Sequence, residues 1–265
     1  MTDAMIERIR NTSCFLLDMD GTFYLGERVL EGSLSFLDAL EEKGKQAIFL
    51  TNNSSKSGAF YVDRLKRMGV DEPFLRVITS GQATARYVLD EFPNKRAYLL
   101  GNRSLASEML QMGVLLDAEK PDYVIVAFDT ELDYAKMEKV CTLVRKGVPY
   151  IATHPDFNCP TEHGFIPDIG AIMAFIEAST GRKADMIIGK PYTGIVSDVL
   201  RHTEFQEHEL AMVGDRLYTD IATGVNFGML SILVLTGETT IPMLEASDIQ
   251  PDITVERLSS LIPYL

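Results

Sequence analysis

The sequence predicts an α/β protein built around a parallel sheet. Short apolar stretches of strand length alternate with stretches of helical periodicity, and several apolar stretches end abruptly in polar residues. Ligands of open parallel sheets bind outside the carboxyl ends of the strands, so the polar residues at those ends are the candidate functional residues. The chain has 265 residues, 46% of them hydrophobic, which is enough for a sizeable core and one or two domains.

The first predicted strand carries the most distinctive pattern. The apolar run 14–17 leads directly into Asp18 and Asp20, followed by Gly21 and Thr22. Because side chains alternate along an extended backbone, Asp18 and Asp20 lie on the same side of it. Two carboxylates there repel one another unless a cation or a shared proton relieves the repulsion. The pattern favours a metal-assisted site, and an ordinary Asp-Gly turn is the simpler alternative.

The alternation continues to the end of the chain. A flap with a turn at Gly26 follows the first strand, and Gly44 and Gly69 stop the next two helices. Further strands are predicted at 47–50, 77–79, 96–100, 122–128, 149–152, 185–189, 209–213, 230–235 and near 252. Helices are predicted at 33–44, from after 57 to about 68, at 82–91, 103–112, 133–146, 169–179, after 191, at 219–226 and up to 262.

A long polar stretch at 153–164 interrupts this alternation, and we expect it to be an irregular loop. Long loops inside compact domains are more often functional than not. Asp168 is placed to cap the helix 169–179. Residues from about 82 to 184 are expected to form a second, small α/β unit, and the first pattern resumes at 185–191.

Matched polar groups follow four of the predicted strands. They are Asp18 with Asp20, Thr51 with Asn52, Lys190, and Asp215 with Asp220. The ends of parallel strands lie at one edge of a sheet, so these residues are expected to meet. Each residue alone has an ordinary explanation as a turn, a helix entry or a solvated loop residue. The coincidence of several polar clusters with strand ends favours a common site.

This set of groups suits phosphoryl transfer from a monoester. A carboxylate such as Asp18 can attack phosphorus and form an aspartyl-phosphate. The attack of an anion on a dianion needs a neutralising cation, and hard oxygen ligands suit Mg²⁺. Asp18, the Asp20 carbonyl and Asp215 are expected to ligate it, with Asp220 binding directly or through water. Phosphate oxygens suit Thr51 and the Asn52 N–H near a helix start, and a lysine at 190 balances the negative charges.

The motifs 18–22, 51–54, 189–191 and 214–220 resemble, in order, the four motifs of the haloacid-dehalogenase-like (HAD) phosphatases. The chain is most similar to the NagD-like, para-nitrophenylphosphatase subgroup with a class IIA cap, and the likeness includes the cap stretch 152–164 and the pair at 181–182. It implies a Rossmann-like HAD core of residues 1–80 and 185–265. A smaller α/β cap domain of residues 81–184 is inserted into it.

The resemblance also implies a division of labour. Asp18 becomes the nucleophile, and Asp20 the general acid that protonates the leaving group and then the base that activates water. Lys190 orients both anions. The implied phosphate-binding set is Gly21, Thr51, Asn52, Asn53 and Lys190, and the implied Mg²⁺-binding set is Asp18, Asp20, Asp215 and Asp220.

The chain departs from the pattern of that family in the cap. His154 stands where the family usually has Asn, and the stretch 167–170 stands where a small Pro-Gly turn is usual. The cap supplies contacts to the leaving group, so these departures bear on the substrate. The candidate specificity residues are His154, Asp156, Asn158 and Asp168, and a polar loop with an Asp N-cap is the alternative.

Composition excludes several classes of function. A net charge of −13 without a basic stripe argues against nucleic-acid binding. No apolar run reaches the length of a membrane span or a signal peptide, so we expect a cytoplasmic protein without membrane association. The three cysteines lack the spacing of a zinc site or a disulfide framework. A homodimer is compatible with the sequence.

The leading hypothesis is a Mg²⁺-dependent hydrolase of a sugar, polyol or nucleoside monophosphate. A dehalogenase or a phosphotransferase or mutase on the same scaffold is the enzymatic alternative. Dehalogenation needs neither the metal nor the acid, so Asp20, Asp215 and Asp220 argue against it. A non-catalytic sensor of a phosphorylated ligand is the alternative from another class, and no catalytic carboxylate is missing to favour it.

Overall fold

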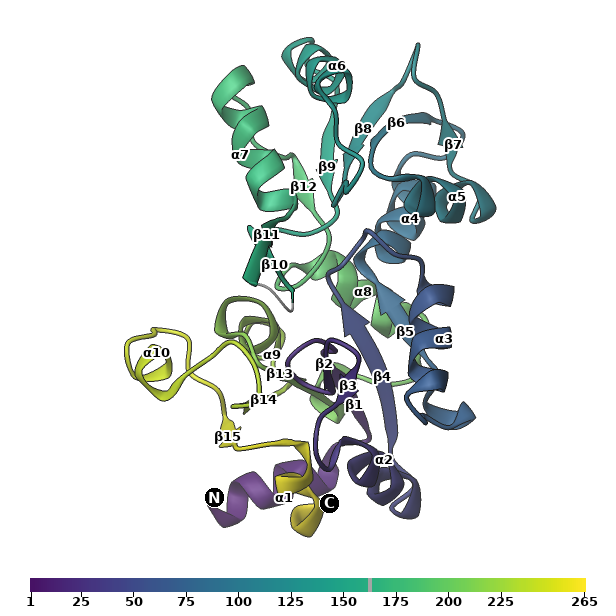
Figure 1. Ribbon diagram of the computed structural model, residues 1–265. Helices are drawn as coiled ribbons and strands as arrows, with labels where there is room; N and C mark the ends of the chain where they lie inside the picture. Colours follow the sequence, from purple (N-terminus) through teal and green to yellow (C-terminus); the bar gives the residue numbers. More distant parts are fainter. Residues whose placement is uncertain (162–163) are drawn as a thin grey trace. The chain divides into compact units, whose positions relative to one another are not determined.

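The structure is a computed structural model that describes residues 1–161 and 164–265 (Figure 1). Glu162 and His163, which belong to the predicted cap stretch, lie outside the described residues. The chain divides into two compact units, which are described separately. Unit 1 comprises Met1–Thr51, Tyr61–Ile78 and Val199–Leu265, and unit 2 comprises Asn52–Phe60 and Thr79–Asp198.

A six-stranded sheet forms the centre of unit 1, in the order β15-β14-β13-β1-β4-β5. Its strands are β1 (Cys14–Leu17), β4 (Gln46–Thr51), β5 (Val77–Thr79), β13 (Leu210–Gly214), β14 (Leu230–Val234) and β15 (Ile253–Val255). The central strand β1 runs parallel to both neighbours, with Leu17 opposite Phe49 on β4 and Val213 on β13. The carboxyl ends of β1, β4 and β13 therefore lie at the same edge of this sheet.

Helices and short turns pack around this sheet. They are α1 (Asp3–Asn11), α2 (Ser33–Glu42), η1 (Glu72–Phe74), η2 (Glu207–Glu209), η3 (Leu217–Ile221), α9 (Ala222–Asn226), α10 (Ile241–Glu245) and η4 (Leu258–Tyr264). Two further helices, α3 (Gly58–Arg67) and α8 (Thr193–Arg201), have residues in both units. Strand residues Phe15, Phe49 and Val213 share one buried core with Phe36 of α2 and Leu261 of η4. The two ends of the chain, α1 and η4, pack against one another (Figure 1).

Unit 2 has its own parallel sheet, in the order β12-β9-β8-β6-β7. Its strands are β6 (Arg96–Leu100), β7 (Leu115–Leu116), β8 (Tyr123–Val126), β9 (Tyr150–Ala152) and β12 (Met186–Ile187), and its helices are α4 (Ser80–Glu91), α5 (Arg103–Gln111), α6 (Tyr134–Arg145) and α7 (Ile169–Thr180). Val140 of α6 and Ile176 of α7 are fully buried in one core with Val124 of β8. An antiparallel hairpin, β10 (Asn158–Thr161) and β11 (Gly164–Pro167), precedes α7.

The predicted class is confirmed: the chain is an α/β protein with two parallel sheets. The flap is the hairpin β2 (Tyr24–Leu25) and β3 (Arg28–Val29), with Gly26 at positive φ in its turn. In the part of the chain that the structure describes, no helix is long and apolar enough to cross a membrane.

Three local expectations were wrong. The stretch 153–164 is not wholly irregular, because β10 occupies its second half. The strand before Lys190 does not join the first sheet; β12 pairs with β9 of unit 2, and the Ile188 N–H extends this pairing to the Ala152 carbonyl. The predicted helix 219–226 is a π-helical turn, η3, followed by the short α9. The elements α1, α10 and β7 were not predicted.

Candidate active site

Three carboxylates gather at the strand ends of unit 1. The Asp18 N–H donates to the Val213 carbonyl at 2.9 Å, so Asp18 continues the pairing of β1 with β13. Asp215 follows β13 directly, and Asp220 lies in the turn after it. One carboxylate oxygen from each of Asp18, Asp215 and Asp220 lies within 4.8 Å of the other two. The structure thus brings together three predicted site residues that are up to about 200 positions apart in the sequence.

Asp215 is held on several sides. Its Oδ2 accepts the Glu238 N–H at 2.6 Å, and its Oδ1 lies 3.4 Å from the Thr22 hydroxyl, which donates to it. Glycines flank the carboxylate: a Cβ at Gly237 would stand 2.0 Å from Oδ2, and a Cβ at Gly21 would stand 2.5 Å from it. Gly21 also has a φ of +86°, a backbone conformation that favours glycine. Both glycines are therefore required by the position of Asp215.

Asp220 is fully buried in the π-helical turn η3. Its Oδ2 accepts the Arg216 N–H at 3.1 Å, and its own N–H donates to the Arg216 carbonyl at 3.1 Å. A Cβ at Gly214 would stand 2.2 Å from the Asp220 Cγ, so the end of β13 has room for this side chain only because residue 214 is glycine. π-helical turns inside helices occur often at functional sites.

Burial and the neighbouring Asp220 charge raise the pKa of Asp215 to about 7. Hydrogen bonding from Glu238 and the positive Arg216 oppose this shift. A cation at this position would offset both the desolvation and the repulsion. The donor set consists of carboxylate oxygens, which are the ligands that hard divalent cations prefer. The three aspartates thus fit a metal ion chemically and electrostatically.

Asp20 lies in the loop that follows β1, and Met19, which stands between Asp18 and Asp20, is buried. Burial is the main cause that raises the pKa of the Asp20 carboxyl; the Arg64 and Arg216 charges and the Gly26 N–H oppose the shift. The Arg64 guanidinium stacks on the Tyr24 ring at 4.4 Å and donates to the Gly26 carbonyl at 2.5 Å. A carboxyl with a raised pKa and a nearby cation is suited to proton transfer.

The predicted phosphate-binding residues fall into both units. Thr51 is the last residue of β4 in unit 1. Phe49 of β4 pairs with Leu17 of β1, and Thr51 and Met19 each come two residues after this pair. Gly21 belongs to the same unit, and its carbonyl accepts the Thr236 hydroxyl at 2.6 Å. Asn52, Asn53 and Lys190 belong to unit 2.

Within unit 2, Asn52 and Lys190 are bonded to one another. The Lys190 N–H donates to the Asn52 Oδ1 at 2.8 Å, and the Asn52 Nδ2 donates to the Lys190 carbonyl at 3.0 Å. The same Nδ2 donates to Asp156 Oδ2 at 2.9 Å. The Lys190–Pro191 peptide bond is cis, and the Lys190 side chain is 1% exposed. Asn53 instead forms a local turn, because its Oδ1 accepts the Ser55 N–H at 2.9 Å.

The cap candidates separate by burial. His154, Asp156 and Asp168 are buried, with at most 4% of each residue exposed, whereas Asn158 is exposed at the start of β10. Asp168 caps α7 as predicted, by accepting the Ile169 N–H at 2.6 Å. The His154 Nε2 lies 3.1 Å from the Asp168 Oδ1. The two positions at which the chain departs from the family pattern are therefore hydrogen-bonded partners.

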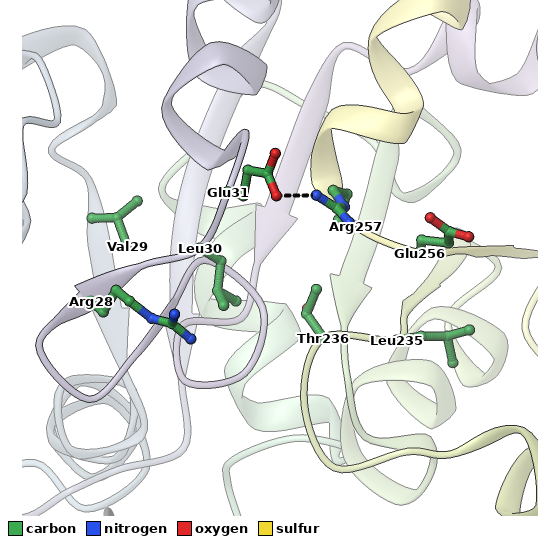
Figure 2. A pocket seen from close by; sticks show the side chains of 8 residues that line it. All are labelled: Arg28, Val29, Leu30, Glu31, Leu235, Thr236, Glu256 and Arg257. Carbon is green, nitrogen blue, oxygen red and sulfur yellow. Dashed lines mark hydrogen bonds and ion pairs between the residues drawn. The ribbon is translucent and has the colours of Figure 1, made fainter.

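Two further residues, Glu238 and Thr236, hold Asp215 and the Gly21 carbonyl and were not predicted as site residues. They belong to a polar run that begins two residues after β14, so the same strand-end signal would have found them. Thr236 also lines a pocket of about 540 Å³ in unit 1 (Figure 2). Its charged lining residues are Arg28, Glu31, Glu256 and Arg257, whose formal charges cancel, and Glu31 pairs with Arg257. This pocket is not suited to a phosphate dianion.

The sheet topology and the aspartate cluster together define the class: an α/β protein whose acidic site, suited to a metal ion, lies at the carboxyl ends of parallel strands. Residues 15–115 match the family described as haloacid dehalogenase-like hydrolase, and residues 187–261 match the family described as HAD-hydrolase-like. An acid sugar phosphatase of Staphylococcus haemolyticus is 36% identical over 258 residues, which cover 97% of this chain and 98% of that protein.

Solved structures agree with this match. The 4-nitrophenylphosphatase of Thermotoga maritima is 48% identical with a TM-score of 0.93, over 97% of this chain and 98% of that one. The glycerol phosphate phosphatase of Mycobacterium tuberculosis, solved in complex with calcium, is 26% identical with a TM-score of 0.86, over 96% and 76%. The chain belongs to the HAD-like hydrolases, in the NagD and p-nitrophenylphosphatase subgroup. The resemblance noted in the sequence is confirmed.

Proposed function

We propose that this protein is a Mg²⁺-dependent phosphatase that hydrolyses a small phosphorylated metabolite, such as a sugar phosphate, a polyol phosphate or a nucleoside monophosphate. The observation that carries the proposal is the cluster of Asp18, Asp215 and Asp220 at the ends of two adjacent parallel strands. Relatives named acid sugar phosphatase, 4-nitrophenylphosphatase and glycerol phosphate phosphatase support the substrate class.

The two carboxylates of the first strand end have separate roles. An Asp18 oxygen attacks phosphorus while the ester P–O bond breaks, and Asp20 gives its proton to the departing alkoxide. Asp20 then takes a proton from water, whose oxygen attacks the phosphorus of the aspartyl-phosphate. Phosphate leaves, and the Asp18 carboxylate is regenerated. The raised pKa of Asp20 supports the assignment of the proton donor to that residue.

Asp18, the Asp20 carbonyl and Asp215 would hold Mg²⁺, with Asp220 binding directly or through water. When bound, the ion neutralises the charge of the carboxylates and the phosphate. Gly21, Thr51, Asn52 and Asn53 would bind phosphate oxygens through the two consecutive polar strand ends. Lys190 contributes a buried positive charge, and its backbone is fixed by Asn52.

We retain the division into a core of residues 1–80 and 185–265 and a cap of residues 81–184 as part of this proposal. Asn158, which is exposed at the start of the hairpin β10–β11, is the cap candidate that suits a direct contact to the leaving group. His154, Asp156 and Asp168 are buried among residues of unit 2 and suit an indirect role.

The test is phosphate release from p-nitrophenyl phosphate with and without Mg²⁺, followed by a panel of sugar, glycerol and nucleoside monophosphates. Asp18→Asn is expected to abolish turnover because the amide is a poor nucleophile. Asp38→Asn is the matched control, because it makes the same change at an exposed position of α2. An inactive wild-type protein across the panel with Mg²⁺ would refute the proposal.

The same measurements separate the alternatives. A dehalogenase would release halide from a haloacid and stay active in EDTA. A phosphotransferase or mutase would consume the substrate without releasing an equivalent amount of free phosphate. A sensor would bind phosphorylated ligands tightly without turnover.

A further inference from the structure

The loop that carries the hairpin β10–β11 is closed at its base by its own residues. It leaves the sheet of unit 2 after β9 and returns at α7. The Asp168 N–H donates to the Phe157 carbonyl at 2.9 Å, and the Gly170 N–H donates to the Asp156 carbonyl at 2.7 Å. A Cβ at Gly170 would stand 2.7 Å from the Pro155 carbonyl oxygen, so the two ends of the loop are in close contact.

A buried imidazole and a buried carboxylate complete this closure. His154 is 0% exposed, and its Nε2 lies 3.1 Å from Asp168 Oδ1 and 3.9 Å from Asp156 Oδ2. A carboxylate accepts hydrogen bonds and does not donate them, so Nε2 carries a proton and donates to Asp168. On the other side of the ring, Nδ1 lies 3.0 Å from the Thr153 hydroxyl and 3.4 Å from the Ser80 hydroxyl.

Capping of α7 explains Asp168 but does not explain His154. The cap needs only an oxygen for the Ile169 N–H, which Asp168 supplies at 2.6 Å. Accepting this N–H requires no imidazole behind the carboxylate. His154 therefore has a further purpose, and the groups around it indicate which one.

Three neighbours of His154 lead to Asn52 or to Lys190. Ser80, beside Nδ1, donates its hydroxyl proton to the Asn52 carbonyl. Asp156, two residues after His154, accepts from the Asn52 side chain at 2.9 Å. Gly189 packs so closely against His154 that a Cβ added at Gly189 would stand 2.7 Å from the His154 Cβ. The residue after Gly189 is Lys190, whose N–H is fixed by Asn52 at 2.8 Å.

We propose that His154 and Asp168 are positioning residues, which fix the loop base and thereby Asp156, Asn52 and Lys190 in the geometry that phosphate binding requires. This inference rests on the proposed function for the roles of Asn52 and Lys190, which are to bind phosphate and to supply a positive charge. Their positioning is a property of unit 2 alone. Members of a buried polar network hold one another in place, so removal of one member leaves the others poorly placed. Small misplacements of substrate-binding groups lower rates strongly.

Two neutral replacements of His154 form a matched pair. A glutamine carboxamide reaches about as far as Nε2 and can still donate to Asp168, whereas an asparagine carboxamide reaches only about as far as Nδ1. His154→Gln is expected to keep kcat/KM within about threefold, and His154→Asn to lower it by about tenfold or more. The loss should include weaker inhibition by inorganic phosphate, because the affected residues bind the phosphate group.

A second pair keeps the test decisive where a His154 variant fails to fold. Asp168→Asn keeps an oxygen that can cap α7 and accept from His154. Asp168→Ser caps helices equally well but is too short to reach the imidazole. Asparagine at 168 is expected to preserve phosphate inhibition, and serine is expected to weaken it by about tenfold. Both variants should keep α7, as far-ultraviolet circular dichroism would show.

Hydrogen exchange of the Lys190 amide supplies a readout that needs no catalysis. Exchange should accelerate in His154→Asn and Asp168→Ser and remain close to wild type in the two conservative variants. If wild type is inactive but the Lys190 amide behaves as expected, the proposed function fails and the positioning role stands. Wild-type kinetics and exchange in His154→Asn, or equal losses in the Asn and Gln variants, would overturn the positioning role.

Discussion

Gly237 stands directly against Asp215: a Cβ on Gly237 would lie 2.0 Å from the Asp215 Oδ2. The next residue, Glu238, donates its N–H to the same oxygen at 2.6 Å. The loop after β14 thus presses its backbone onto the carboxylate that β13 carries. A side chain at 237 would push away both the donor and the acid.

Gly237→Ala is therefore expected to weaken Mg²⁺ binding and to lower kcat/KM, each by about tenfold or more, because the carboxylate must move. The protein should stay folded, since residue 237 is exposed. Titration of activity against Mg²⁺ measures the effect. Thr240→Ala changes an exposed residue of the same loop and should match wild type. Equal Mg²⁺ dependence in the two variants would contradict the assignment of Asp215.

The pKa of Asp215 predicts how Mg²⁺ binding depends on pH. Burial and Asp220 raise that pKa from 3.8 to about 7, so the folded protein holds the proton more tightly than the unfolded chain does. Without metal, the stabilising contribution of this group is complete below about pH 4 and is lost as the pH rises through about 7. Mg²⁺ needs the ionised carboxylate, so its affinity should increase with pH up to that value.

The increase in melting temperature caused by a fixed Mg²⁺ concentration should thus be much larger at pH 8 than at pH 5.5. Calorimetric melting with Mg²⁺ and with EDTA at both pH values measures it. In Asp215→Asn the difference between the two pH values should shrink. A Mg²⁺ effect that is largest at low pH would show the pKa argument to be wrong.

The core of the site was accessible from the sequence because its signal is local. Asp18 and Asp215 each follow an apolar strand directly, Asp20 comes two residues after Asp18, and parallel strands bring such ends to one edge. The fold class followed from the same alternation. The meeting of Asp18 with Asp215 therefore required only that β1 and β13 lie side by side, as they do in the structure.

The remaining features depend on contacts that leave no local pattern. β12 has two residues, too few for any periodicity to reveal that it joins the second sheet. Pro160 lies inside β10, and proline argues against a strand in a sequence-based prediction. His154 and Asp168 lie at the two ends of a loop. They become partners only because the folded loop brings its ends together, and no sequence pattern indicates this contact.

Gly189→Ala should disturb the residues of unit 2 that we propose to bind phosphate, without changing the aspartate cluster. A Cβ at 189 would lie 2.6 Å from the Asn52 Oδ1 and 2.8 Å from the Thr153 carbonyl oxygen. Weaker inhibition by inorganic phosphate, by about tenfold, is expected. Lys183→Ala, at an exposed position before the same strand, serves as the control. Unchanged phosphate inhibition would argue against a role for Asn52 in binding phosphate.

Arg64 is the largest of the influences that lower the pKa of Asp20 against the effect of burial. Its guanidinium is held on the Tyr24 ring and by the Gly26 carbonyl, so its charge stays close to the carboxyl. Arg64→Gln removes this charge, so less opposes the increase that burial causes in the pKa of Asp20, and this pKa should rise further. The limb of the pH–rate profile that reports Asp20 should therefore move to higher pH.

Lys66→Gln is the control, because it removes an equal charge from the same helix, at an exposed ion pair with Glu72. It should leave the profile in place. A shift of the limb to lower pH in Arg64→Gln, or equal shifts in both variants, would show that Arg64 does not act on Asp20.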